Sequence, residues 1–117
     1  MAVSNRLSTQ MVTILNGASL SGEMATGGQS VIGIAMPAAW TAAGVSFQVS
    51  PDGGTTWNEL ASASTVVAVT AAAGQYIYLG ADMFAGVNML KVRSGTSGVP
   101  VVQGADRIVT LILKALV

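Results

Sequence analysis

Few residues in this chain of 117 could do acid–base or nucleophilic chemistry. It holds five acidic residues and lacks histidine and cysteine, which removes Ser-His-Asp triads, Cys-His pairs and thiolate metal sites. The closest carboxylates in sequence are Asp52 and Glu59, which flank one turn and a short strand. Acid–base work would need the two carboxyl groups to face one cleft, about 5 Å apart in a retaining glycosidase. Nothing in the spacing predicts that arrangement, so we expect no catalytic residues and no enzyme.

Bound ions, cofactors and nucleic acids are not expected either. Asp52, Asp82 and Asp106 fall in predicted loops but lack the alternating oxygen ligands of a calcium loop. The segment Gly95–Pro100, GTSGVP, has neither the strand–loop–helix context nor the following lysine of a phosphate loop. The basic residues are too few for a nucleic-acid surface, and the formal net charge is zero. The basic residues that could line such a surface are Lys91, Arg93, Arg107 and Arg6.

The most patterned stretch, SPDGGTTW, begins at Ser50 and ends at Trp57. Proline followed by aspartate and two glycines is typical of a tight turn, because the glycines accept positive φ and the aspartate accepts backbone N–H bonds. The stretch resembles the Asp-box, S-x-D-x-G-x-T-W, a hairpin element usually remote from active sites. The matching positions are Ser50, Asp52, Gly54, Thr56 and Trp57. We interpret the stretch as a structural turn, with the Trp57 ring in the core, in preference to a ligand site.

The composition indicates a surface that other proteins cover. Only 9% of residues are charged, against about 25% in an average domain. Near-neutral proteins tend to associate, so we expect a dimer or trimer. The uncharged run from Met24 to Pro51 is long enough to span a membrane, but Gly33, Pro37 and alternating polar residues interrupt it. We therefore expect no membrane partner. The N-terminus lacks the apolar segment of a signal peptide, so synthesis in a cytoplasm without export is expected.

Alternation of apolar and polar residues predicts a protein made of short strands. In the segment 44–50, Val45, Phe47 and Val49 should face the core, while Tyr76 and Tyr78 share one face of another strand. Seven or eight strands are predicted, separated by glycine-rich turns: 11–15, 30–36, 45–49, 57–60, 65–70, 75–80, 88–94 and 107–114. The segments 36–43 and 80–86 could each hold a single helical turn.

The fold class predicted is all-β: a single-domain antiparallel β-sandwich, jelly-roll-like, with seven or eight short strands. Residues 1–9 are polar and without pattern, and are expected to form an N-terminal arm. Residues 10–117 are expected to form the sandwich domain.

Two long segments of the chain resemble a family of small virion structural proteins of tailed phages and prophages. They are MPAAWTAAGVSFQVSPDGGTTWNEL and LKVRSGTSGVPVVQGADRIVTLILK, and the likeness extends from about NGASLSG to the C-terminus. The resemblance implies a capsid decoration (cement) protein, a β-sandwich that binds the outside of the head. The partner implied is the major capsid protein, and the location is the virion, after synthesis in the host cytoplasm. The resemblance supplies no catalytic residues.

The alternative function is a carbohydrate- or receptor-binding module of a tail, baseplate or fibre. Such modules display aromatic rings on one face. Here aromatic residues make up 5% of the chain, and only Tyr76 and Tyr78 are placed to form a sugar platform.

Overall fold

The computed structural model describes residues 7–80 and 82–115, which form eleven strands and no helix. Six of the strands are two or three residues long. The bounds are β1 Leu7–Ile14, β2 Met24–Ala25, β3 Ser30–Ala35, β4 Val45–Ser50, β5 Asn58–Glu59, β6 Ala61–Ser62, β7 Thr65–Val66, β8 Ala68–Val69, β9 Tyr76–Tyr78, β10 Met89–Ser94 and β11 Arg107–Lys114.

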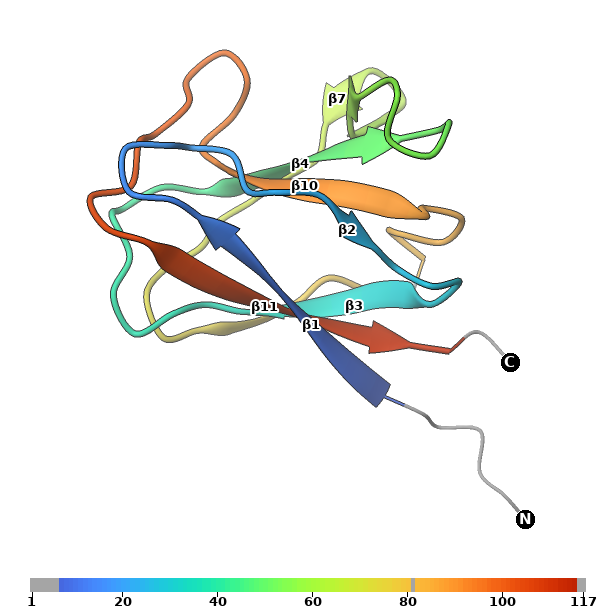
Figure 1. Cartoon of the computed structure of the whole chain (residues 1–117), viewed down its shortest axis with the longest axis horizontal. Coiled ribbons are helices and arrows are strands. Elements are labelled where there is room, and N and C mark those ends of the chain that lie inside the picture. Colours follow the sequence, from blue (N-terminus) through green and yellow to red (C-terminus); the bar gives the residue numbers. More distant parts are fainter. Residues whose placement is uncertain (1–6, 81, 116–117) are drawn as a thin grey trace.

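Two sheets face each other across the core (Figure 1). Sheet A has the order β1-β11-β3-β9, and sheet B has the order β2-β10-β4-β5, with β8 also pairing with β4. Every pairing is antiparallel, and β6 and β7 form a separate hairpin between β5 and β8. The predicted single-domain all-β sandwich is confirmed.

The strand order is that of a jelly roll. β1 pairs with β11, β2 with β10, β3 with β9, and β4 with β5 and β8, as in one long hairpin rolled up on itself. Successive strands therefore alternate between the sheets, except along the run from β4 to β8. This rolling places β1 and β11, the first and last strands of the described part, side by side in sheet A.

Side chains from both sheets fill the space between them, because alternate residues of each strand point inward. Val45, Phe47, Leu90 and Val92 are fully buried, as their alternation predicts. Phe84, from the turn after β9, packs edge-on against Phe47 with 4.9 Å between ring centroids. The buried cluster consists of Val12, Ile14, Met24, Val31, Ile34, Met36, Val45, Phe47, Leu79, Phe84, Leu90, Val92, Val109, Leu111 and Leu113.

In the described residues the structure has eleven strands where seven or eight were predicted. β2 and β6 fall in no predicted strand, and the bounds of other elements also differ. β1 begins at Leu7, so Leu7, Ser8 and Thr9 belong to the sandwich, while residues 1–6 of the expected arm lie outside the described part. The predicted strand 65–70 is split, because β7 turns back onto β6 before β8 joins β4. Neither segment expected to hold a helical turn is helical in its described residues. The segment 36–43 contains bends, and the segment 80–86 contains a hydrogen-bonded turn at residues 82–86. We find no helix long and apolar enough to cross a membrane in the described residues.

Candidate functional site

The Asp-box turn joins β4 to β5 and is held by the side chains that its pattern names. The Ser50 hydroxyl accepts the N–H of Gly54 at 2.8 Å and donates to the Asp52 carboxylate at 2.9 Å. The same Asp52 oxygen accepts the N–H of Thr56 at 2.8 Å, and the Trp57 indole donates to the carbonyl of Gly54 at 3.1 Å. The loop is thus closed on itself by its own side chains.

Both glycines of this turn adopt positive φ. Gly53 has φ of 77° and Gly54 has φ of 103°, values that residues with a Cβ rarely reach. The backbone N–H of Thr56, and then its hydroxyl and the Ser50 hydroxyl, lower the pKa of Asp52 below its ordinary value. These hydrogen bonds stabilise the charged form of the carboxylate. They also mean that the carboxylate is bonded to groups of its own loop.

Trp57 does not enter the core, contrary to the expectation. Its ring is half-buried on the outer face of sheet B, where Lys91 Nζ lies 4.3 Å from the ring centroid. The reason is the parity of the strands: Lys91 points outward from β10, and the turn delivers Trp57 to the same side. The ring therefore forms a cation–π contact at the surface.

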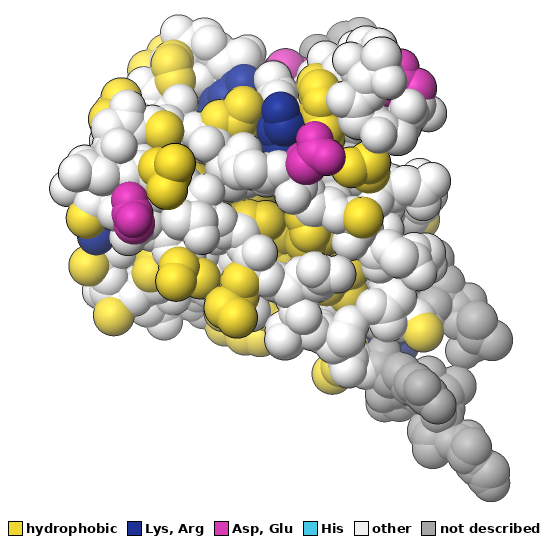
Figure 2. All heavy atoms as spheres, in the orientation of Figure 1, with side chains coloured by type: hydrophobic (Ala, Val, Ile, Leu, Met, Phe, Trp, Pro, Cys, Tyr) yellow, Lys and Arg dark blue, Asp and Glu magenta, His cyan; other side chains and the backbone are white. Residues whose placement is uncertain are grey.

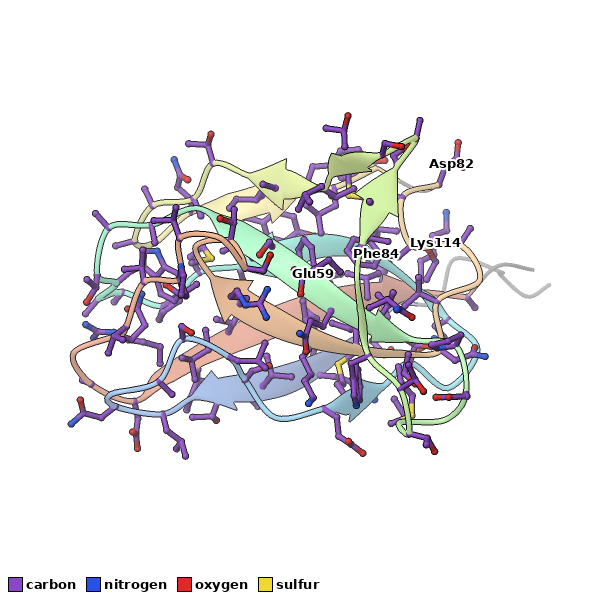
Figure 3. The ribbon with its side chains drawn as sticks, turned by 90° about the horizontal axis from the view of Figure 1, so that it is seen from above. Glu59, Asp82, Phe84 and Lys114 are labelled. Carbon is purple, nitrogen blue, oxygen red and sulfur yellow. The ribbon has the colours of Figure 1, made fainter. Side chains whose placement is uncertain are left out.

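Glu59 is held on the same outer face by two partners. Its carboxylate accepts the Arg93 guanidinium at 2.6 Å and the Gln48 amide at 3.1 Å. Figure 3 looks onto this sheet and labels Glu59, with Asp82 lying apart from it toward the end of the molecule. Since Asp52 and Glu59 each bind different partners, the structure does not join them into one acid–base pair.

The other charged residues considered for ion or nucleic-acid binding are dispersed. Asp106 accepts the N–H of Asn16 at 2.8 Å, and the adjacent Arg107 donates to Gln103 and Thr41, whereas Arg93 pairs with Glu59. In the described part of the chain, no group of three or more acidic residues could hold a metal ion. Arg6 lies outside the described residues.

The loop Gly95–Pro100 is a closed hairpin. Thr96 and Val99 exchange backbone hydrogen bonds of 3.2 Å, and Gly95 forms a bridge to Pro100. Because these N–H groups bond within the loop, they do not form an open cradle for phosphate.

Gln103 forms a buried junction that the sequence reasoning missed. Its side chain is fully buried and its amide nitrogen donates to the Thr41 carbonyl at 3.1 Å and the Ser94 hydroxyl at 2.7 Å. Its amide oxygen accepts the Thr41 N–H at 2.9 Å and the Arg107 side chain at 3.1 Å. One side chain thus ties the loop before β4 to the ends of β10 and β11. No local pattern marks it, since a lone glutamine in a loop is ordinarily exposed.

Charged side chains gather over sheet B, and Figure 2 shows blue and magenta groups together over β4 and β10. The opposite surface, the outer face of sheet A, has a different character. There the large outward-pointing apolar side chains are exposed: Leu7 61%, Met11 67%, Ile108 52%, Tyr76 60% and Tyr78 69%. We refer to these five residues as the tyrosine face.

The register of sheet A explains why the tyrosine face is continuous. Met11 lies opposite Thr110, which lies opposite Ala35, which lies opposite Tyr76. The next row runs from Thr9 through Ile112 and Gly33 to Tyr78. Within these two rows no side chain is charged, and Lys114 stands at the end of the sheet, opposite Leu7. An uncharged face of this kind is typical of a surface that binds another protein.

Tyr76 is positioned by a glycine in the neighbouring strand. A Cβ added to Gly33 would lie 3.0 Å from the Tyr76 hydroxyl and ring. The missing side chain therefore lets the ring lean over β3. The expectation that Tyr76 and Tyr78 share one exposed face agrees with the burial of β9.

Comparisons with known proteins found no similar protein. The chain matches no protein-family description, no curated protein and no solved structure.

Proposed function

We propose that this protein is a structural component of a phage virion, specifically a capsid decoration (cement) protein. In this role it binds the outside of the assembled head and clamps neighbouring major capsid subunits. The segments that resemble small virion proteins of tailed phages suggest the setting. The observation that carries the docking role is the tyrosine face, five exposed apolar side chains on the outer side of sheet A, joined by rows of uncharged residues.

The composition of the tyrosine face favours protein as its partner. Interface cores are depleted of charge and enriched in tyrosine and methionine. Tyr76, Tyr78 and Met11 supply those residue types at 60%, 69% and 67% exposure. The charged residues of sheet B lie on the opposite side, where Arg93 pairs with Glu59 at 2.6 Å and Lys91 lies over the Trp57 ring.

The build of the molecule also suits a clamp. A cement protein needs a rigid body and no cleft. The Asp-box turn and the buried Gln103 junction fix the loops, and in the described residues no buried side-chain nitrogen or oxygen lacks a hydrogen-bond partner. A body held in this way can transmit load between two capsid subunits without deforming.

The test is to prepare virions with and without the gene and to follow genome release on a temperature ramp. We expect particles lacking the protein to assemble, but to release their genome at lower temperature. Adding the purified protein back should restore the release temperature. Identical release curves with and without the protein would overturn the proposal.

A matched pair of variants tests the surface. Tyr78→Glu places a charge within the tyrosine face, whereas Ser97→Glu places one in the exposed loop between β10 and β11. We expect the first variant to lose add-back to deletion particles, because docking would bury an unpaired carboxylate. The second should bind as the wild type does. Equal binding by both variants would exclude the tyrosine face as the contact.

A second candidate function is a carbohydrate-binding module of a tail, baseplate or fibre. It is favoured by one observation, the two exposed rings of Tyr76 and Tyr78 on one side of β9. Residues two apart in a strand are about 7 Å apart, and aromatic faces can stack on sugars at such spacing. Deletion particles with normal heads that fail to adsorb to cells would favour this candidate over the cement role.

A further inference from the structure

The edges of the two sheets differ greatly in length. Sheet B is bounded by β2 and by β5 and β8, each of two residues, and sheet A is bounded on one side by β9, of three residues. The remaining edge is β1, with eight residues. Short edge strands offer few unpaired backbone groups to another chain, whereas a strand of eight residues offers a full row.

β1 also lacks the other features that keep edge strands from pairing. Its sequence, LSTQMVTI, contains no charged residue and no proline. Its pairing with β11 runs through all eight residues without a register shift, so no bulge twists the edge away. Residues Leu7 to Met11 are exposed. Among the described residues, β11 is the strand that pairs with β1, and the opposite edge is left open.

We infer that β1 pairs antiparallel with β1 of a second copy of this chain, joining two four-stranded sheets into one of eight strands. An antiparallel pair of identical strands is related by a two-fold axis, so each edge completes the other. Self-pairing brings no like charges together, because β1 carries none. A charged partner segment would find no opposite charge on β1, whereas a second β1 brings no charge that needs a partner.

Symmetry fixes the possible registers. Directly opposite residues share a face of the sheet, so under a two-fold axis one residue near the middle of β1 lies opposite itself. The middle of Leu7–Ile14 falls at Gln10 and Met11. Met11 belongs to the tyrosine face, whereas Gln10 points to the other side and donates to the Ala25 carbonyl at 3.2 Å.

This arrangement places both tyrosine faces on the same side of the dimer. The two-fold axis stands perpendicular to the sheet, so it exchanges the copies without turning either face over. The dimer would then present a doubled docking surface, and two linked contacts hold a partner more tightly than one. The pairing itself does not depend on the proposed function, since it concerns the backbone edge of β1.

The absence of cysteine from the chain allows a direct test by disulfide formation. Opposite residues of an antiparallel pair have Cα atoms about 4.5–5.5 Å apart, within the range that a disulfide spans. We expect Gln10→Cys or Met11→Cys, oxidised at micromolar concentration, to give a disulfide-linked dimer on a non-reducing gel. Ser97→Cys, in the loop between β10 and β11, is the control: it should form no disulfide and should run at the mass of one chain on the same gel. Equal cross-linking of all three variants, or none by the first two, would overturn the inference.

A second measurement uses the native chain. Light scattering behind a sizing column should give twice the chain mass of 11.7 kDa for the wild type and for Ser97→Lys. Of Gln10→Lys and Met11→Lys, the variant at the residue that lies opposite itself should give a monomer, because two like charges would meet across the two-fold axis. A monomeric wild type at tens of micromolar, or a dimer that survives both lysine variants, would refute pairing through β1. A dimer that never binds a head would instead refute the proposed function and leave this inference standing.

Discussion

Arg93 on β10 and Glu59 on β5 meet across the strand that separates them, with 2.6 Å between Arg93 Nη1 and Glu59 Oε1. β4 lies between the two strands, and its Gln48 donates to the second carboxylate oxygen of Glu59 at 3.1 Å. The Arg93 side chain is 10% exposed, so the pair is shielded from water more than an ordinary surface ion pair. It fastens the short edge strand β5 to the sheet.

We predict that this pair couples strongly in a double-mutant cycle. Arg93→Met and Glu59→Gln should each destabilise the fold, since each leaves the other partner poorly paired. The double variant should lose less than the sum, by about 1–2 kcal/mol. Urea unfolding of the four proteins measures the coupling. If the loss in the double variant equals the sum of the two single losses to within about 0.3 kcal/mol, the two side chains are not coupled and the prediction is wrong.

The Asp52 carboxylate should make stability depend on pH. Hydrogen bonds from the Thr56 N–H and hydroxyl and from Ser50 lower the pKa of Asp52 in the folded state below its ordinary value of 3.8. This contribution is therefore fully present above the unfolded pKa and is lost as pH falls through the folded pKa. Asp52→Asn should melt below the wild type at pH 7, and the gap should narrow below about pH 4. A gap that stays constant across this range would contradict the assigned role of the carboxylate.

Gln103 should be among the most sensitive polar residues of the fold. Gln103→Leu keeps the side-chain volume but removes four hydrogen bonds, and it leaves the Thr41 backbone and Ser94 without these partners. We expect a loss of about 2–4 kcal/mol in the free energy of unfolding. Thermal and urea melts measure it. A loss below about 0.5 kcal/mol, typical of surface substitutions, would show that water replaces the amide.

Two glycines of the loop after β10 form a matched pair. Gly95 has φ of 85°, and a Cβ there would overlap the Val99 carbonyl oxygen and lie 2.9 Å from the Val101 nitrogen. Gly98 has open space around the same position. Gly95→Ala should therefore cost about 3 kcal/mol, through backbone strain and overlap with backbone atoms. Gly98→Ala should change stability by less than about 0.5 kcal/mol. Similar melting temperatures for both variants would contradict the close packing of this loop.

Local patterns predicted the strands and the Asp-box turn because both depend on neighbouring residues. Alternation set which residues of β4 and β10 face the core, and the turn pattern at Ser50–Trp57 closes through bonds spanning four residues or fewer. The sequence did not predict the hairpin of β6 and β7, and the reason is the residues at its turn. Its turn residues, Ala63 and Ser64, have φ of 50° and 73°, where asparagine and glycine are the usual signal.

The long-range contacts could not be predicted in the same way. Gln103 bonds to Thr41, which is 62 residues away, and Arg93 bonds to Glu59, which is 34 residues away. Such partners meet only after the jelly roll has formed, so no spacing along the chain marks them. The expectation that Trp57 enters the core was wrong because it followed the size of the ring. Trp57 lies two residues before Glu59, whose side chain points outward, and side chains two residues apart in extended chain share a side.

The last prediction concerns salt, and it separates the two faces of the sandwich. If the tyrosine face docks on the head, attachment joins uncharged surfaces, and screening has little to weaken. The affinity of the purified protein for deletion particles should then change by less than about threefold between 50 mM and 500 mM salt. If the charged outer face of sheet B were the contact, affinity would fall steeply over this range. Lys91→Gln serves as the matched variant, since it removes a charge beside Trp57 on sheet B and leaves the tyrosine face intact. Binding that is steeply salt-dependent, and is weakened by Lys91→Gln, would assign the contact to sheet B and refute docking through the tyrosine face.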